Sequence, residues 1–438
     1  MSDENTARHA ECTVEFDGVD ITSSIKPYLL SLTFTDNEED ASDDLQIKLQ
    51  DREGVWMTDW LQKMLDGDVS AASSDGYKVG DVVQFLGGPH YKASTDKKAN
   101  GTPKAGPAKI IIIKQGALHP YHVIHTDGTS RVYGWVDASE ISGKSGGSSS
   151  GSGEGGLKIR ATITACNWHS DGKDEALDCG EFELDSINAS GPPDIITIKA
   201  TGLPYTSQIR QTKQSKGWEK YKLSGIANEM AKKNGMQSQF LAKQDPEYKR
   251  VEQYRCSDID FLSQLCHDAG LSLKCTDGKI VIFDQKEYEG KDSAWTVTKD
   301  DKSYIKWSHT LGQAGTQYAS CRVSYVGPNG KPLEGIAYVK DYDAKSKTNQ
   351  QLEVYAPVTS KAEAKELAAK KLRLHNKFER QVGFTYSGNP GKVAGLTFEA
   401  KDFGPWDGKY IVKQAKHTVT GSGGYTTQVS GRHVLGGY

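Results

Sequence analysis

The sequence predicts a mainly β protein with an α+β segment in the middle of the chain. Short apolar stretches alternate with polar residues toward both ends, which is the pattern of half-buried antiparallel strands. Of the 438 residues 46 are glycine, and the hydrophobic fraction is only 36%. These values are typical of a chain with many turns and much surface. A chain of this length is expected to form two to four domains.

The first strands are predicted to form an antiparallel β-barrel that an insertion interrupts. Residues 1–72 would supply its N-terminal part and residues 157–203 its C-terminal part. Residues 56–65 have helix-like spacing, after which a strand should begin near Asp68 but is found only at Leu157. The expected strands are 13–16, 29–35, 44–50, 157–166, 181–184 and 195–200.

The insertion is predicted to be a domain of its own. Residues 73–141 contain about five short strands separated by turns, which suggests a small barrel. Residues 142–156 are almost entirely glycine and serine, a composition that favours a flexible linker.

The middle segment, residues 204–290, is predicted to be α+β. Ser257 is placed to cap a helix that Gly270 ends, and Asp277-Gly278 is placed to turn a hairpin. Ser224 is expected to cap an earlier helix. No residue of this segment stands out for chemistry, so we interpret it as a packing module.

The last segment, residues 291–438, is predicted to form a second antiparallel barrel that includes a helix at 361–378. Ser360 and Glu363 form the capping-box pattern at the start of this helix. The expected barrel strands are 381–386, 396–400, 410–420 and 425–434.

Composition excludes several classes of function. The net charge is -3, so neither nucleic acid nor an anionic membrane is expected as a partner. The polar start and the lack of long apolar stretches predict a soluble protein made in the cytoplasm. The seven cysteines show no CxxC spacing, which indicates reduced thiols rather than disulfides or a structural zinc site.

Two groups of residues are of types that could bind a metal ion or act as a nucleophile, but their placement in the sequence does not favour either function. His119, His122 and His125 are spaced by three, which on a strand sends successive side chains to opposite faces. Cys166 ends a strand before an acidic, glycine-containing turn that also leads to Cys179, whereas a thiol nucleophile needs a basic neighbour or a helix start. We therefore expect no catalytic residue, no metal ligand and no cofactor.

The insertion resembles the bacterial SH3-like modules of phage and bacterial enzymes that lyse cell walls. The resemblance runs from Tyr77-Lys78-Val79-Gly80-Asp81 to Tyr133-Gly134-Trp135-Val136. It implies binding of a wall peptide or glycan. The contact candidates are Tyr91, His119, Tyr121, His122, Tyr133 and Trp135, and the alternative is that half of them are barrel core.

The rest of the chain resembles the phage late-control protein D family of tail hubs, which are relatives of the hub part of type VI secretion spikes. The resemblance is carried by Arg255 and Ser257-Asp258-Ile259-Asp260-Phe261-Leu262, by Ala269-Gly270-Leu271 and by Trp406-Asp407-Gly408-Lys409-Tyr410. It implies two similar barrels flanking an α+β middle and assembly as a trimer. Three chains would then present six similar faces to a tail tube and a three-fold face to a spike.

These expectations predict a structural baseplate hub in a contractile phage tail or phage-tail-like particle, assembled in the bacterial cytoplasm. Its expected partners are two further copies of itself, the tail tube protein, a separate central spike protein, other baseplate proteins and, through the insertion, peptidoglycan. The alternative is a tail-associated peptidoglycan hydrolase that the SH3-like domain targets. A wall-binding adhesin is difficult to reconcile with a sequence lacking an export signal.

Overall fold

The structure is a computed structural model of the whole chain. It describes residues 8–16, 19–39, 42–52, 54, 56, 77, 79–114, 116–126, 130–144, 157–168, 173–203, 208–312, 317–327, 330–340, 342–347 and 349–435. The helix expected at 56–65 and the Gly/Ser-rich linker lie almost entirely outside these residues. Contacts divide the chain into two compact units, one of residues 1–50, 155–188 and 197–438 and the other of residues 51–154 and 189–196.

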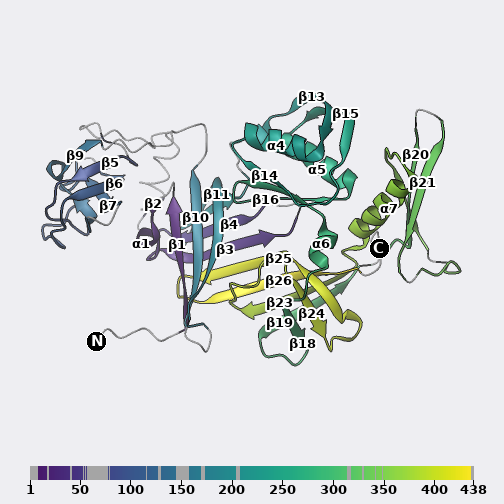
Figure 1. Ribbon diagram of the computed structural model, residues 1–438. Coiled ribbons are helices and arrows are strands. Elements are labelled where there is room, and N and C mark those ends of the chain that lie inside the picture. The colour runs from purple at the N-terminus through teal and green to yellow at the C-terminus, as the bar shows by residue number, and fades with distance from the viewer. Residues whose placement is uncertain are drawn as a thin grey trace. The chain divides into compact units, whose positions relative to one another are not determined.

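The first unit is built on a 13-stranded sheet (Figure 1). Its N-terminal half begins with β1, which pairs with β10 and with the short β2. The short helix α1 (Thr22–Ile25) follows β2. The strands of this half are β1 (His9–Phe16), β2 (Val19–Asp20), β3 (Leu29–Asn37), β4 (Asp44–Gln50), β10 (Lys158–Cys166), β11 (Glu175–Ser190) and β12 (Ile195–Thr201).

The C-terminal half of the sheet encloses its own apolar core. Phe384, Phe398 and Tyr410 pack at its centre, and Trp295 stacks on Phe398 with 4.9 Å between ring centroids. The strands of this half are β18 (Trp295–Thr298), β19 (Tyr304–Leu311), β23 (Arg380–Ser387), β24 (Thr397–Lys401), β25 (Gly408–Thr420) and β26 (Tyr425–His433). A 3-10 turn, η3 (Gly404–Trp406), precedes β25.

The two halves are joined by antiparallel pairing of β25 with β3, from Gln414 opposite Asn37 to Thr420 opposite Ser31. Figure 1 shows β25, in yellow, alongside β3, in purple. At the end of this pair a Cβ on Gly421 would lie 1.8 Å from the carbonyl oxygen of Leu29, so only glycine fits. The mainly β fold class is confirmed, and the strands of both expected barrels are hydrogen-bonded into one sheet.

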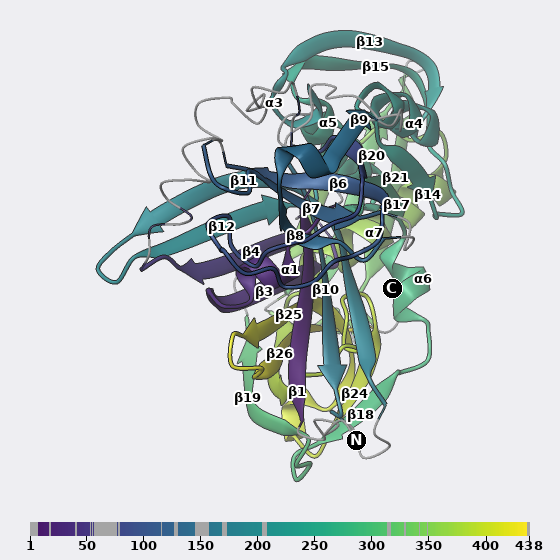
Figure 2. The ribbon, with the colours of Figure 1, turned by 90° about the vertical axis from the view of Figure 1, so that its left-hand side faces the viewer.

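The middle segment combines helices with two small sheets. β13 and β15 form a long antiparallel ribbon that arches at the top of Figure 2. β14 pairs in parallel with β17, and β17 pairs antiparallel with β16. The elements are α3 (Gln208–Gln211), β13 (Gln214–Lys222), α4 (Leu223–Lys233), β14 (Gln237–Phe240), β15 (Glu247–Cys256), α5 (Asp258–Ala269), β16 (Ser272–Thr276), β17 (Lys279–Phe283) and α6 (Gln285–Glu289).

The helix and hairpin predicted around Ser257 are confirmed. The Oγ of Ser257 accepts a hydrogen bond from the backbone N–H of Asp260 at 3.2 Å, and Gly270 ends α5 with φ 69°. Asp277 and Gly278 have φ of 47° and 67° and turn the hairpin. Asp258, which is fully buried, accepts from the side-chain amide of Gln253 at 2.9 Å. The start of α5 is thereby fixed to β15.

The cap expected at Ser224 is wrong. α4 begins at Leu223 and its N-cap is Lys222, two residues before the expected cap. Ser224 lies in the first turn, where its backbone N–H and its hydroxyl donate to the Asp245 carboxylate at 3.0 and 2.6 Å. The first turn of α4 therefore finds its hydrogen-bond acceptor in Asp245, which is distant in sequence, and not in the Ser224 side chain.

A three-stranded sheet with one helix lies outside the 13-stranded sheet. β20 pairs with β21 and β22, and α7 packs against β20 and β21. The helix spans 361–376, close to the predicted 361–378. A Cβ on Gly335 would lie 2.2 Å from the backbone nitrogen of Lys365, so glycine allows the close approach of α7. The elements are β20 (Ser320–Val326), β21 (Pro332–Tyr338), β22 (Gln351–Tyr355) and α7 (Lys361–Asn376).

The second unit contains an antiparallel five-stranded sheet in the order β8-β7-β6-β5-β9. Val83, Phe85, Ile110 and Val123 form its core and are fully buried. The elements are β5 (Val82–Phe85), β6 (Gly106–Ile113), β7 (Tyr121–His125), β8 (Tyr133–Val136), the 3-10 turn η2 (Ala138–Glu140) and β9 (Ile141–Lys144).

None of the helices among the described residues is long and apolar enough to cross a membrane.

Candidate functional site

A buried arginine connects three parts of the first unit. Arg432, on β26, is fully buried, and its guanidinium donates to both carboxylate oxygens of Glu38 at 2.9 and 2.6 Å. It also donates to Glu289 at 2.5 Å. Glu38 directly follows β3 and Glu289 ends α6. One side chain therefore ties the N-terminal strands and the middle segment to the C-terminal strands.

Arg432, Glu38 and Glu289 form a charged junction, and two lysines add further ion pairs to it. Lys274, on β16, donates to Asp36 at 2.7 Å and lies 3.5 Å from Asp43. Lys377, which follows α7, pairs with Glu39. The side chains of these lysines and their partners are at most 18% exposed. The segment after β3 is therefore held by basic residues from two other parts of the unit.

The electrostatics of this junction suit a structural role. Burial acts to lower the pKa of Arg432, but Glu38 and Glu289 outweigh it and raise the pKa above its usual value. Burial raises the pKa of Asp43 to about 6, against the attraction of Lys274. A buried charge is costly unless an opposite charge and good hydrogen bonds accompany it. The junction should therefore hold its elements in one arrangement.

An exposed apolar row marks one edge of the 13-stranded sheet. β19 is the last strand in the sheet order, and its only strand partner among the described residues is β23. Ile305, Trp307 and Leu311 alternate along it and are 63, 45 and 48% exposed. An edge strand with unpaired backbone groups and apolar side chains is a surface on which another chain can pair. β19 is therefore a candidate assembly surface.

The apolar row on β19 was not predicted from the sequence, although a signal for it was present. Residues 305, 307, 309 and 311 are isoleucine, tryptophan, histidine and leucine, a period-two pattern that predicts an apolar strand face. The pattern alone does not tell whether that face is covered.

In the second unit, two of the six predicted contact residues, Tyr133 and Trp135, pack against a third, the buried His122. His122 is 8% exposed, and Tyr133 and Trp135 present their rings edge-to-face to it at centroid distances of 5.4 and 5.3 Å. Burial lowers the pKa of His122 to about 4, and the Nδ1 of the neutral ring has no hydrogen-bond partner. A ligand could reach this group through Tyr133, which is partly exposed.

The other three predicted contact residues are placed differently. Tyr121 is 1% exposed and packs in the core of the second unit, so it cannot touch a ligand at the surface. Tyr91 stacks on His119 with 3.5 Å between ring centroids. The His119 nitrogens lie 2.7 Å from Asp137 Oδ1 and 2.8 Å from the carbonyl oxygen of Asp96. Both nitrogens are already within hydrogen-bond distance of protein oxygens, so a metal ion would have to displace one of these contacts.

The thiols of Cys12, Cys166 and Cys275 are poorly suited to nucleophilic chemistry. Burial raises the pKa of Cys12 to about 11 and that of Cys275 to about 12. Burial also raises the pKa of Cys166, and Asp174 and Glu11 add to the rise. These thiols stay protonated near neutral pH, whereas the thiolate is the reactive form. His169, the histidine closest in sequence to Cys166, lies outside the described residues.

Comparison with known proteins identifies the family of the chain. Residues 200–423 match the model of the phage tail baseplate hub (GPD) family. The chain belongs to this family. The match includes the middle segment and most of the C-terminal strands of the hub, and the predicted resemblance to tail hubs is confirmed.

Two solved structures show the same fold as this hub protein. A tail protein from Neisseria meningitidis MC58 aligns with a TM-score of 0.57 at 8% identity, covering 97% of each chain. The 43 kDa tail protein of prophage MuSo2 from Shewanella oneidensis aligns with a TM-score of 0.52 at 12% identity, covering 97% of this chain and 98% of its own. No curated protein matches the sequence.

Proposed function

We propose that three copies of this chain surround one axis in the baseplate of a contractile phage tail or phage-derived particle. The main support for this proposal is the pairing of β25 with β3, because it holds the N-terminal and C-terminal strands of one chain together as two halves of a single sheet. Three chains then contribute six such halves in a ring, a number that matches a six-fold tail tube on one side. A separate three-fold spike protein binds on the other side. The role is structural rather than catalytic.

The junction around Arg432 supports this role. A hub transmits load between a tube and a spike, so its parts should not move relative to one another. Arg432 binds Glu38 and Glu289, which belong to different segments, and all three side chains are buried. The apolar edge at β19 supplies the surface for a neighbouring subunit or another baseplate protein.

The second unit is an SH3-like module that binds peptidoglycan or another baseplate protein. Its antiparallel five-stranded sheet and the aromatic group around His122 support this part of the proposal. Aromatic side chains beside a polar atom with no partner form a common kind of ligand surface.

The trimer is tested with a charge placed on the apolar edge. Ile305→Lys should weaken self-association by about tenfold or more, since a lysine there would be desolvated in the interface. Native mass measurement of the purified chain, alone and with tube and spike proteins, would report the stoichiometry. Leu118→Lys is the matched control, because Leu118 is 59% exposed and belongs to the second unit. A chain that stays monomeric with both partners present contradicts the trimer.

Wall binding is tested by sedimentation with purified peptidoglycan. The full chain should be retained, and Trp135→Ala should lower retention by about tenfold, since a buried aromatic contact contributes on the order of 1–2 kcal/mol. Tyr254→Ala is the control, because Tyr254 is 69% exposed on β15 of the first unit. Absence of retention would favour a baseplate protein as the ligand. A cleared zone in a peptidoglycan gel would favour the hydrolase alternative.

A further inference from the structure

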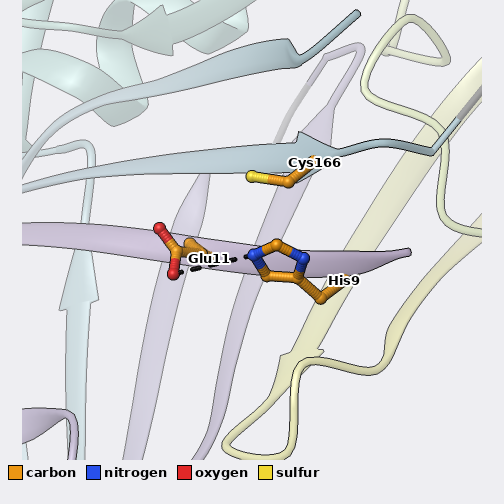
Figure 3. A group of neighbouring side chains, drawn as sticks. All are labelled: His9, Glu11 and Cys166. Carbon is orange, nitrogen blue, oxygen red and sulfur yellow. Dashed lines mark ion pairs between the residues drawn. The ribbon is translucent and has the colours of Figure 1, made fainter. Parts of the chain in front are cut away.

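Three side chains that can bind metal ions meet on one face of the N-terminal strands. His9 and Glu11 are two residues apart on β1, and His9 lies directly opposite Cys166 on β10. Alternate residues of a strand share a face, and directly opposed residues of an antiparallel pair point to the same side. Figure 3 shows the imidazole, the carboxylate and the thiol facing one another from the two strands.

The distances between these groups are close to those of a metal site. One ligand atom from each of the three residues lies within 4.8 Å of the other two. The Nε2 of His9 is 3.8 Å from the Oε1 of Glu11. Tetrahedral zinc has bonds of about 2.0 Å to nitrogen and oxygen and about 2.3 Å to sulfur, which places its ligands about 3.3–3.7 Å apart. Small rotations of the His9 and Glu11 side chains, which are partly exposed, would close the difference.

We propose that His9, Glu11 and Cys166 bind a zinc-class divalent transition-metal ion, with a fourth position open to water. A thiolate and an imidazole select such an ion over magnesium or calcium, which prefer oxygen ligands. This site does not depend on the hub function proposed above.

The surroundings allow an ion to enter. The side chains of His9 and Glu11 are 26 and 50% exposed, whereas Cys166 is buried. Lys26 Nζ lies 3.2 Å from Glu11 Oε1, but this ion pair is exposed and contributes at most about 1 kcal/mol. A divalent ion can therefore displace the lysine from the carboxylate.

The chemistry of the thiol fits an ion that replaces a proton. Asp174 and Glu11 add to the raised pKa of Cys166 because their charges disfavour a nearby thiolate. The same carboxylates attract a cation. Binding would deprotonate the thiol and release its proton to solvent, as is usual for zinc thiolates.

The position of the site suggests what the ion would do. His9 begins β1 and Cys166 ends β10, and the backbone N–H of Ala10 donates to the Gly423 carbonyl oxygen in the β25–β26 turn at 2.9 Å. The ion would tie the start of β1 to β10 beside this turn. No disulfide joins any of the described cysteines, so the ion would supply a cross-link that the covalent structure lacks there.

The proposal is tested on the full chain after chelation, with cobalt(II) as a spectroscopic probe and zinc as competitor. We expect one equivalent of cobalt to give a thiolate-to-cobalt charge-transfer band that zinc removes. The band should vanish in Cys166→Ser, and cobalt affinity should fall by about tenfold or more in His9→Gln and in Glu11→Gln. Zinc should also raise the melting temperature of the unmodified chain.

Two further variants sharpen the test. Cys12→Ser, on the same strand, should leave the band unchanged, since residue 12 points to the opposite face from His9 and Glu11. Lys26→Met should bind cobalt more tightly because it removes the competing cation. A chain without the band, or a band that persists in Cys166→Ser, overturns the proposal. Because His9 is partly exposed, His9→Gln decides the matter if Cys166→Ser does not fold.

Discussion

Arg432→Met is expected to lower the free energy of unfolding by about 3–5 kcal/mol, the cost of removing one partner of a buried ion pair. The variant leaves the Glu38 and Glu289 carboxylates buried without their guanidinium, and both side chains are at most 4% exposed. Methionine fills a similar volume, so the loss of stability would reflect the missing charge and not a cavity. Denaturant unfolding of the purified chain measures it.

Arg322→Met is the matched control. Arg322 also binds a glutamate, with its Nε 2.6 Å from Glu334 Oε1, but both side chains are about 40% exposed. An exposed ion pair is screened by solvent and contributes far less to the free energy of unfolding than a buried one. Adding Glu38→Gln and Glu289→Gln to Arg432→Met should recover part of the loss, because no uncompensated charge then remains. Equal losses in the two arginine variants would mean that Arg432 is not the link between the segments.

Elements fixed by neighbouring residues could be predicted from the sequence. α5 begins after the Ser257 cap and ends at Gly270, and Asp277-Gly278 turns the hairpin that follows. Each signal acts within a few residues, so it does not depend on the rest of the fold. The same holds for α7, whose cap at Ser360 was predicted.

Elements fixed by distant parts of the chain could not be predicted in this way. The register of β25 on β3 depends on tertiary packing, and so does the parallel pairing of β14 with β17. Nothing in the sequence around Glu38 and Glu39 indicates that Arg432 and Lys377 pair with them in the folded chain. Charges in a sequence do not reveal which of them will be buried.

The candidate contacts of the second unit illustrate both cases. Tyr121 alternates in phase with Val123, a residue typical of a core face, so its burial could have been predicted from the period of the strand. His122 has the opposite phase and is nevertheless buried, because Tyr133 and Trp135 cover it from a neighbouring strand. That cover depends on the pairing of β7 with β8.

His417 should make the first unit sensitive to acid. It is fully buried, donates from Nε2 to the Lys392 carbonyl oxygen at 3.1 Å and accepts at Nδ1 from the Tyr425 hydroxyl at 2.7 Å. This pattern requires the neutral ring. Burial lowers the pKa of His417 from 6.5 to about 4, although Asp36 and the hydrogen bond to Lys392 oppose the change.

The sign of the effect follows from proton binding. Below pH 6.5 the unfolded chain takes up a proton at residue 417, whereas the folded chain does not until about pH 4. The stabilisation is therefore fully present above pH 6.5 and is lost as the pH falls toward 4, by up to about 3 kcal/mol. Asp43 acts in the opposite direction, because its pKa is raised to about 6 and its protonation favours the folded state.

His417→Gln separates these contributions, since glutamine can supply a donor and an acceptor but does not titrate. Between pH 7 and 4.5 the unmodified chain should lose about 2–3 kcal/mol more stability than the variant, as measured by denaturant unfolding at a series of pH values. His433, whose pKa burial also lowers to about 4, is present in both chains and cancels in the difference. If the stability of the two chains falls in parallel with pH, residue 417 is not the acid-sensitive group. The interpretation of His417 as a buried neutral imidazole would then be wrong.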